Sequence, residues 1–142
     1  MSSTSPPAPL PRERGVRFAG YAAIFDRPDS GGDVVRKGAF AETLKRNGEV
    51  PLLWQHQGQP IGTIEHLSED GWGLRVIARL GEGAARVGDL LKGGNLKGLS
   101  FGYRVREAKQ ADGLRELHSL DLVEVSLVAR PMQKLARVHA VE

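Results

Sequence analysis

The chain has 142 residues, a net formal charge of +3, 40% hydrophobic residues and 26% charged residues, a composition typical of one globular domain of ordinary size. The absence of cysteine excludes disulfide bonds, thiolate metal sites and cysteine nucleophiles. No apolar run is long enough to span a membrane, and the N-terminal MSSTSPPAPLP lacks the basic and apolar segments of a signal peptide. Because the basic residues are scattered and few aromatic residues lie among them, we expect neither membrane contact nor specific nucleic-acid binding.

The N-terminal half predicts a tail followed by strands and one helix. Residues 1–14 are rich in Ser and Pro and are predicted to be disordered, whereas residues 15–142 are predicted to form the folded domain. The expected elements are a strand over 16–25, a turn-rich loop over 26–33, a short helix over 38–48, a strand over 50–56, a strand with an acidic turn over 59–73, and a strand over 74–80. Alternate apolar residues of this last strand should face the core: Leu74, Val76, Ala78 and Leu80.

The C-terminal half predicts a second helix and two longer strands. The expected elements are a helix over 82–95, a strand over 99–108, a turn over 110–113, one long strand or two strands meeting at a bend over 114–129, and a closing segment of partly helical character over 130–142. The helix should turn four apolar residues inward: Ala85, Val87, Leu90 and Leu91. Short strands linked by turns favour a mainly β fold, an antiparallel barrel-like sheet with a few helices outside it.

Polar side chains at strand ends are the first candidates for chemistry. His56 ends the apolar strand VPLLWQH, and Ser100 opens the strand after GGNLKG, with Gly98 and Gly102 on its own face. A nucleophilic serine needs such access, together with a base at hydrogen-bond distance and donors for the oxyanion. Each residue also has a structural explanation, because histidines at loop edges are common and most strand serines only complete hydrogen bonds.

Glu124 lies in DLVEVSLVA, a strand whose two faces are both largely apolar, so its carboxylate should be partly buried and needs a partner. That partner is either an imidazole, whose tautomer the carboxylate would fix, or an arginine such as Arg75 or Arg104. The four histidines lack the close spacing of metal ligands, so we expect no metal and no cofactor. A base, a nucleophile and an orienting acid would then follow one another along the chain.

Around these residues the chain resembles the prohead maturation serine proteases of tailed phages and related gene-transfer particles. The resemblance runs from about residue 18 to residue 132 and rests on five stretches in the same order and spacing: GYAAIFD, GDVVRKGAFAETL, VPLLWQHQGQPIGTI, LKGLSFGYRV and DLVEVSLVARP. This family is related in fold to the herpesvirus assemblins, which have a seven-stranded antiparallel barrel wrapped by helices. The resemblance therefore implies an assemblin-like β-barrel and a serine endopeptidase.

The resemblance also implies roles for individual residues. It makes His56 the general base and Ser100 the nucleophile. The third member is expected on the strand after that of the nucleophile, where assemblins carry a second histidine; we choose Glu124, with Asp121 and His118 as alternatives. Assemblins place an arginine of the oxyanion site in the loop after that strand, where this chain has Arg130. Arg130 either assists the oxyanion or is an ordinary surface charge, and we favour the surface charge.

The family role implied is cleavage of the scaffold or delta segment of the major capsid protein, and of the protease itself, during procapsid maturation. The resemblance places this reaction inside the procapsid in the bacterial host cytoplasm, without secretion, and makes the capsid protein the main partner; a homodimer is left open. The alternative is a catalytically silent barrel that serves as an internal scaffold-binding assembly module. Co-expression with the capsid protein would separate the two.

Overall fold

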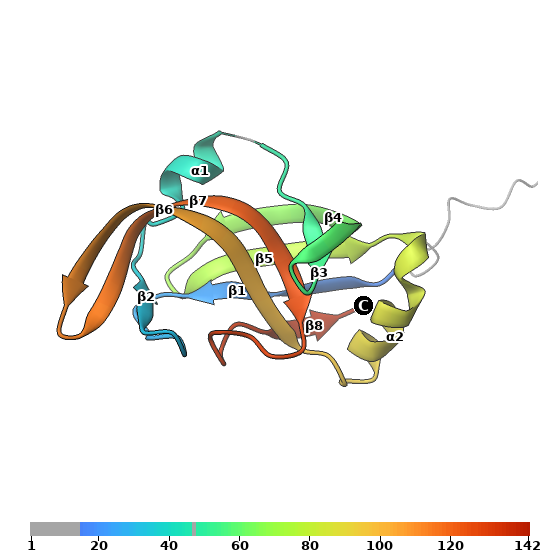
Figure 1. Cartoon of the computed structure of the whole chain (residues 1–142). Helices are drawn as coiled ribbons and strands as arrows, with labels where there is room; N and C mark the ends of the chain where they lie inside the picture. The colour runs from blue at the N-terminus through green and yellow to red at the C-terminus, as the bar shows by residue number, and fades with distance from the viewer. Residues whose placement is uncertain (1–14, 47) are drawn as a thin grey trace, which may run out of the picture.

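Eight strands form one curved sheet in the computed structural model, which describes residues 15–46 and 48–142 (Figure 1). The predicted tail, residues 1–14, lies outside this part of the chain. Two short helices, α1 (Ala41–Lys45) and α2 (Ala85–Lys92), lie beside the sheet. The predicted mainly β fold with flanking helices is therefore confirmed.

The strands follow the predicted order, with a short extra strand near each end of the chain. They are β1 (Arg17–Ile24), β2 (Asp33–Val35), β3 (Leu52–Trp54), β4 (Gln57–Glu69), β5 (Gly73–Leu80), β6 (Gly98–Ala111), β7 (Leu114–Val128) and β8 (Val138–Val141). Among the described residues, no helix combines the length and the apolar character needed to cross a bilayer.

Strand β7 connects the two parts of the sheet. One of its edges pairs with β6 along the whole hairpin, and the other edge pairs with β2 near its start and with β3 near its end. The order then continues from β3 through β4, β5 and β1 to β8. Both β2 and β3 run parallel to β7, so the prediction of a purely antiparallel sheet is wrong at these two pairings. They join segments about 70 or more residues apart along the chain, which local sequence pattern does not encode.

The sheet is not closed, so the predicted barrel is not confirmed. The segment before β8 meets the start of β6 through one isolated bridge, between Gly98 and Arg137, and through two flanking backbone hydrogen bonds. No continuous ladder follows from this bridge within residues 15–46 and 48–142.

The β6–β7 hairpin ends at the predicted turn, where Asp112 and Gly113 have positive φ angles of 51° and 78°. Figure 1 shows the far end of this hairpin extending beyond the rest of the sheet. The segment 114–129 is one long strand, and its pairing with β6 contains three register shifts, the first between Gly102 and Tyr103. These irregularities let the hairpin bend without breaking into separate strands.

The alternation predicted for β5 is confirmed. All four of the residues expected in the core are at most 1% exposed: Leu74, Val76, Ala78 and Leu80. Strand β5 pairs with β1 along one edge and with β4 along the other, so it is an interior strand of the sheet. An interior strand of this kind gives the clearest signal in the sequence, because one entire face must be apolar.

The prediction for residues 130–142 is wrong, because this segment ends in strand β8, which pairs with the edge of β1. The free edge of β1 supplies hydrogen-bonding groups that a helix would leave unpaired.

The inward face predicted for α2 is also wrong in part. Gly88 and Leu91 are buried, whereas Ala85 and Leu90 are exposed. A Cβ atom at Gly88 would lie 2.8 Å from Val16, so this close contact decides which face of the helix turns inward.

Candidate active site

His56 lies in the tight turn between β3 and β4. Trp54 and Gln57 pair across this turn, and the two residues between them, Gln55 and His56, have φ angles of 54° and 64°. A two-residue hairpin turn with two positive φ angles has the type I′ form, in which Asn and Gly are the usual residues. Gln and His adopt this conformation at a cost in free energy, so surrounding contacts must hold it.

Those contacts come from the end of β7. The backbone N–H of Gln55 donates to the carbonyl of Leu127 at 3.0 Å, and the Gln55 side-chain oxygen accepts from the N–H of Ala129 at 3.0 Å. The backbone N–H of His56 donates to Oγ of Ser126 at 3.1 Å. The turn is therefore held at three points, two on β7 and one at Ala129 just after it, and the imidazole takes its position from this segment.

The imidazole of His56 contacts the carboxylate of Glu124 through Nδ1 and Oε1. The other carboxylate oxygen, Oε2, accepts a hydrogen bond from the hydroxyl of Ser126. Glu124 is only 5% exposed, so both oxygens of a buried carboxylate have partners. A carboxylate at Nδ1 holds the ring proton there and leaves the lone pair on Nε2.

The other side of the His56 ring is open. The His56 side chain is 43% exposed, and Nε2 has no hydrogen bond to any described residue. A ring that is held at Nδ1 and free at Nε2 can take a proton from a hydroxyl group placed beside it.

Ser100 lies on the face of the hairpin that carries these groups. In the β6–β7 register Ser100 is opposite Ser126, and Gly102 is opposite Glu124. Directly opposite residues of an antiparallel pair point to the same side, so the Ser100 hydroxyl shares a face with the Glu124 carboxylate. Ser100 is 7% exposed and makes no hydrogen bond to His56 in this structure. The structure thus brings Glu124 and His56 into contact and places Ser100 on the adjoining strand without a direct bond.

The two alternatives for the acid contact other groups. Asp121 accepts hydrogen bonds from Arg46 at 2.9 Å and from Arg106 at 3.3 Å. His118 contacts Glu116 at 3.2 Å. Neither one forms a hydrogen bond or an ion pair with His56, so of the three candidates only Glu124 contacts this imidazole.

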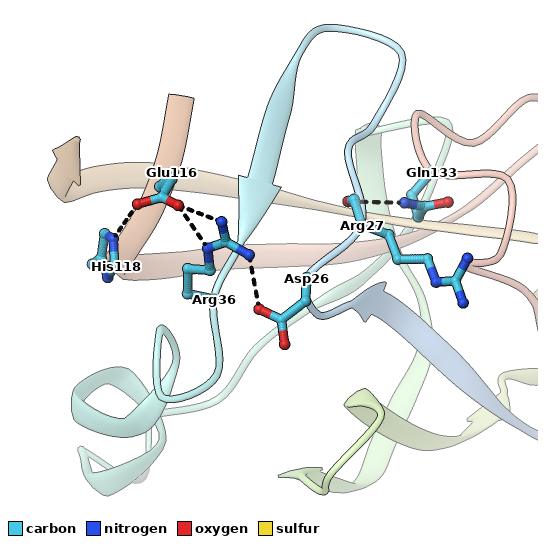
Figure 2. Close-up of polar contacts among 6 residues, drawn as sticks. All are labelled: Asp26, Arg27, Arg36, Glu116, His118 and Gln133. Atoms are coloured by element: carbon cyan, nitrogen blue, oxygen red, sulfur yellow. Dashed lines mark hydrogen bonds and ion pairs between the residues drawn. The ribbon is translucent and has the colours of Figure 1, made fainter. Parts of the chain in front are cut away.

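Figure 2 shows the surroundings of His118. Glu116 lies between His118 and Arg36, and Arg36 also reaches Asp26 at 3.1 Å. The Arg36 guanidinium holds the pKa of the Glu116 carboxyl below its ordinary value, with His118 adding to the effect. The side chain of His118 thus belongs to a surface network of charged groups that joins β7 to the residues before and after β2.

Arg130 follows β7 and is exposed. Within the described chain it forms no ion pair and no side-chain hydrogen bond. Its interpretation as a surface charge stays a prediction.

The described residues also contain no group of three or more histidine or carboxylate side chains that could hold a metal ion.

Comparison with known sequences identifies the family. Residues 8–142 match the family described as caudovirus prohead serine protease. The chain belongs to this family. It is also 34% identical to the prohead protease of Enterobacteria phage HK97 over 94 residues. That alignment covers 62% of this chain and 42% of the HK97 protein, so it spans less than half the length of this relative.

The fold is similar to that of the herpesvirus proteases. The crystal structure of the KSHV protease, solved with a hexapeptide phosphonate inhibitor, superposes with a TM-score of 0.58 at 15% identity, covering 90% of this chain and 65% of that one. The varicella-zoster virus protease gives a TM-score of 0.56 at 13% identity, covering 89% of this chain and 64% of that one. The predicted relation between this phage family and the assemblin fold is thereby confirmed at the level of fold.

The sequence pattern alone assigns no role to Ser126 or Gly102. Ser126 lies two positions after Glu124, so strand alternation places it on the same face, and this spacing was the available signal. Gly102 was noted only as a neighbour of Ser100. In the structure it leaves room for the carboxylate, since a Cβ atom at this position would lie 2.6 Å from Oε1 of Glu124.

Gly102→Ala should therefore disturb the contact between His56 and Glu124. The added methyl group must displace the carboxylate, and small displacements of catalytic groups cost about 10- to 100-fold in rate. With Ser100 as the expected nucleophile, a loss of this size should appear in the rate at which a fluorophosphonate labels it, with little change in thermal stability. Gly83→Ala is the matched control, because a Cβ atom there meets nothing within 4 Å. Equal labelling rates in the two variants would contradict the role given to Gly102.

Proposed function

We propose that this chain is a serine endopeptidase in which Ser100 is the nucleophile, His56 the general base and Glu124 the residue that orients and stabilises the imidazole. The observation that carries the proposal is the buried carboxylate of Glu124 on Nδ1 of a histidine whose Nε2 is free, with Ser100 across the strand pair on the same face. Membership of the prohead protease family supports the same assignment.

The reaction follows from this arrangement. Ser100 Oγ attacks the carbonyl carbon of the scissile bond while His56 Nε2 takes the hydroxyl proton. The imidazolium that forms is stabilised by Glu124, and it then gives its proton to the leaving amine. Water attacks the resulting acyl-enzyme by the same route and restores the Ser100 hydroxyl. The missing bond between Ser100 and His56 fits a resting enzyme, because such contacts often tighten only when substrate binds.

The substrate we propose is the scaffold or delta segment of the major capsid protein, cleaved within the assembling procapsid inside the host cell, and the protease cleaves itself as well. Confinement in a procapsid raises the effective concentration of every cleavable segment. An enzyme of modest turnover then suffices, because each substrate needs to be cut only once. The HK97 relative is named a prohead protease, which supports this substrate class.

Co-expression with the major capsid protein of the same particle tests this function. The wild-type chain should shorten the capsid protein, as measured by intact-mass spectrometry, and Ser100→Ala should leave it at full length. Ser119→Ala, a change in a partly buried serine on β7, is the matched control and should cleave as the wild type does. Full-length capsid protein in all three cultures would reject the protease assignment and favour the silent assembly module.

A further inference from the structure

We propose that Ser126 is a positioning residue of the active site, whose single hydroxyl group fixes both the backbone of His56 and the carboxylate of Glu124. This inference rests on the proposed function and names a residue beyond its three catalytic groups. Ser126 touches neither the substrate nor the bond that breaks, and its effect on the reaction passes through the other two residues.

The hydrogen-bond directions at Ser126 are determined by its partners. A backbone N–H can only donate, so Oγ of Ser126 accepts from His56 at 3.1 Å. An ionised carboxylate can only accept, so the hydroxyl proton goes to Oε2 of Glu124. The contact between Oε1 and Nδ1 closes a ring of three hydrogen bonds through the two catalytic residues.

Burial makes this hydroxyl group hard to replace. Ser126 is fully buried and Glu124 is 5% exposed, so bulk water does not readily take over the bond to Oε2. Without the hydroxyl group, one carboxylate oxygen and the N–H of His56 would both lose their partner, and an unpaired buried polar group is unfavourable. Full burial, together with a proton committed to Glu124, also argues against Ser126 as a second nucleophile beside Ser100.

The contacts of Ser126 differ from those that hold the rest of the turn. Gln55 is fastened separately, through Leu127 and Ala129. Removing the Ser126 hydroxyl should therefore leave the β3–β4 hairpin paired while it frees the backbone of His56, which has a positive φ angle. The expected consequence is a folded enzyme with a poorly oriented base.

The inactivation kinetics of a fluorophosphonate test this role in the full-length chain without knowledge of the natural substrate. Ser126→Ala should lower the maximal inactivation rate constant by about 10- to 100-fold while the inhibitor constant stays the same, because orientation is lost and binding is not. Ser126→Thr keeps a hydroxyl group and should retain most of the rate. Ser126→Cys fills the site with only a weak donor and should behave like Ser126→Ala, which provides a test even if the alanine variant does not fold.

The Nδ1–H proton of His56 gives an NMR signal whose chemical shift general destabilisation of the fold would not change. In proton–nitrogen NMR spectra, the Nδ1–H signal should lie far downfield in the wild type and in Ser119→Ala, and it should move upfield or broaden in Ser126→Ala. Normal inactivation kinetics and an unchanged signal in a folded Ser126→Ala variant would overturn the inference while the proposed function stands. Failure of the wild type to be labelled at Ser100 would overturn both, since Ser126 would then have no reaction to support.

Discussion

Replacing His56 with alanine is expected to lower the rate of capsid-protein cleavage by about 10⁴- to 10⁶-fold, the loss seen when a catalytic base that works together with its serine is removed. The fold should survive, because the ring of His56 is partly exposed in a surface turn and not packed in the core. His66→Ala is the matched control. His66 is exposed on β4 and contacts Ser68 at 2.8 Å, so its loss should leave the cleavage rate unchanged.

The double variant His56→Ala/Ser100→Ala sharpens this prediction. If the two residues act in one proton transfer, the double variant should be no slower than the slower single variant, because each change alone removes the whole mechanism. The measurement is the initial rate of capsid-protein shortening at one enzyme concentration. Losses that add in the double variant, or a His56→Ala rate within about tenfold of the wild type, would show that His56 is not the base for Ser100.

Elements with a strong local signal could be predicted from the sequence. The alternation in β5 is an example, since one face of this strand packs in the core along its whole length and must be apolar. The burial of Glu124 could also be predicted from the apolar residues around it in β7, and it holds although Val123, directly before it, is 43% exposed. In such positions the local pattern and the tertiary environment agree.

The turn that carries His56 could not be predicted. A two-residue hairpin is normally signalled by Asn-Gly or Asp-Gly, and the pair Gln55–His56 carries no such signal. The conformation is imposed by contacts with β7, about 70 residues further along the chain. The apolar pattern before His56 therefore predicts a strand that ends at this residue, whereas His56 lies in the turn that follows the strand.

Strands β2 and β8 were missed for a related reason. Each has four residues or fewer, and each is extended because a longer strand offers it a free edge. Periodicity cannot be read in so short a segment. The role of Gly102 likewise depends on which residue lies opposite it, and this register is known only from the structure.

Glu124→Gln is expected to keep the fold and to lower the cleavage rate by about 10²- to 10⁴-fold. The amide can occupy the same space between His56 and Ser126, and its oxygen can still accept from Nδ1. It carries no negative charge, so it cannot stabilise the imidazolium that forms when Ser100 loses its proton. The loss should appear in kcat, with KM little changed, because the charge is needed mainly in the transition state.

His118→Gln is the decisive comparison, because assemblins fill the third position with a histidine. His118 contacts Glu116 in the surface network of Figure 2 and makes no contact with His56, so this variant should cleave at close to the wild-type rate. Both variants are measured in the same assay for capsid-protein shortening, and their thermal stabilities are compared to show that each is folded. A nearly silent Glu124→Gln beside a damaging His118→Gln would make the site one of the Ser-His-His kind. The reverse result would make the buried carboxylate of Glu124 the third member, bound to Nδ1 of an imidazole whose Nε2 is free to take the proton of Ser100.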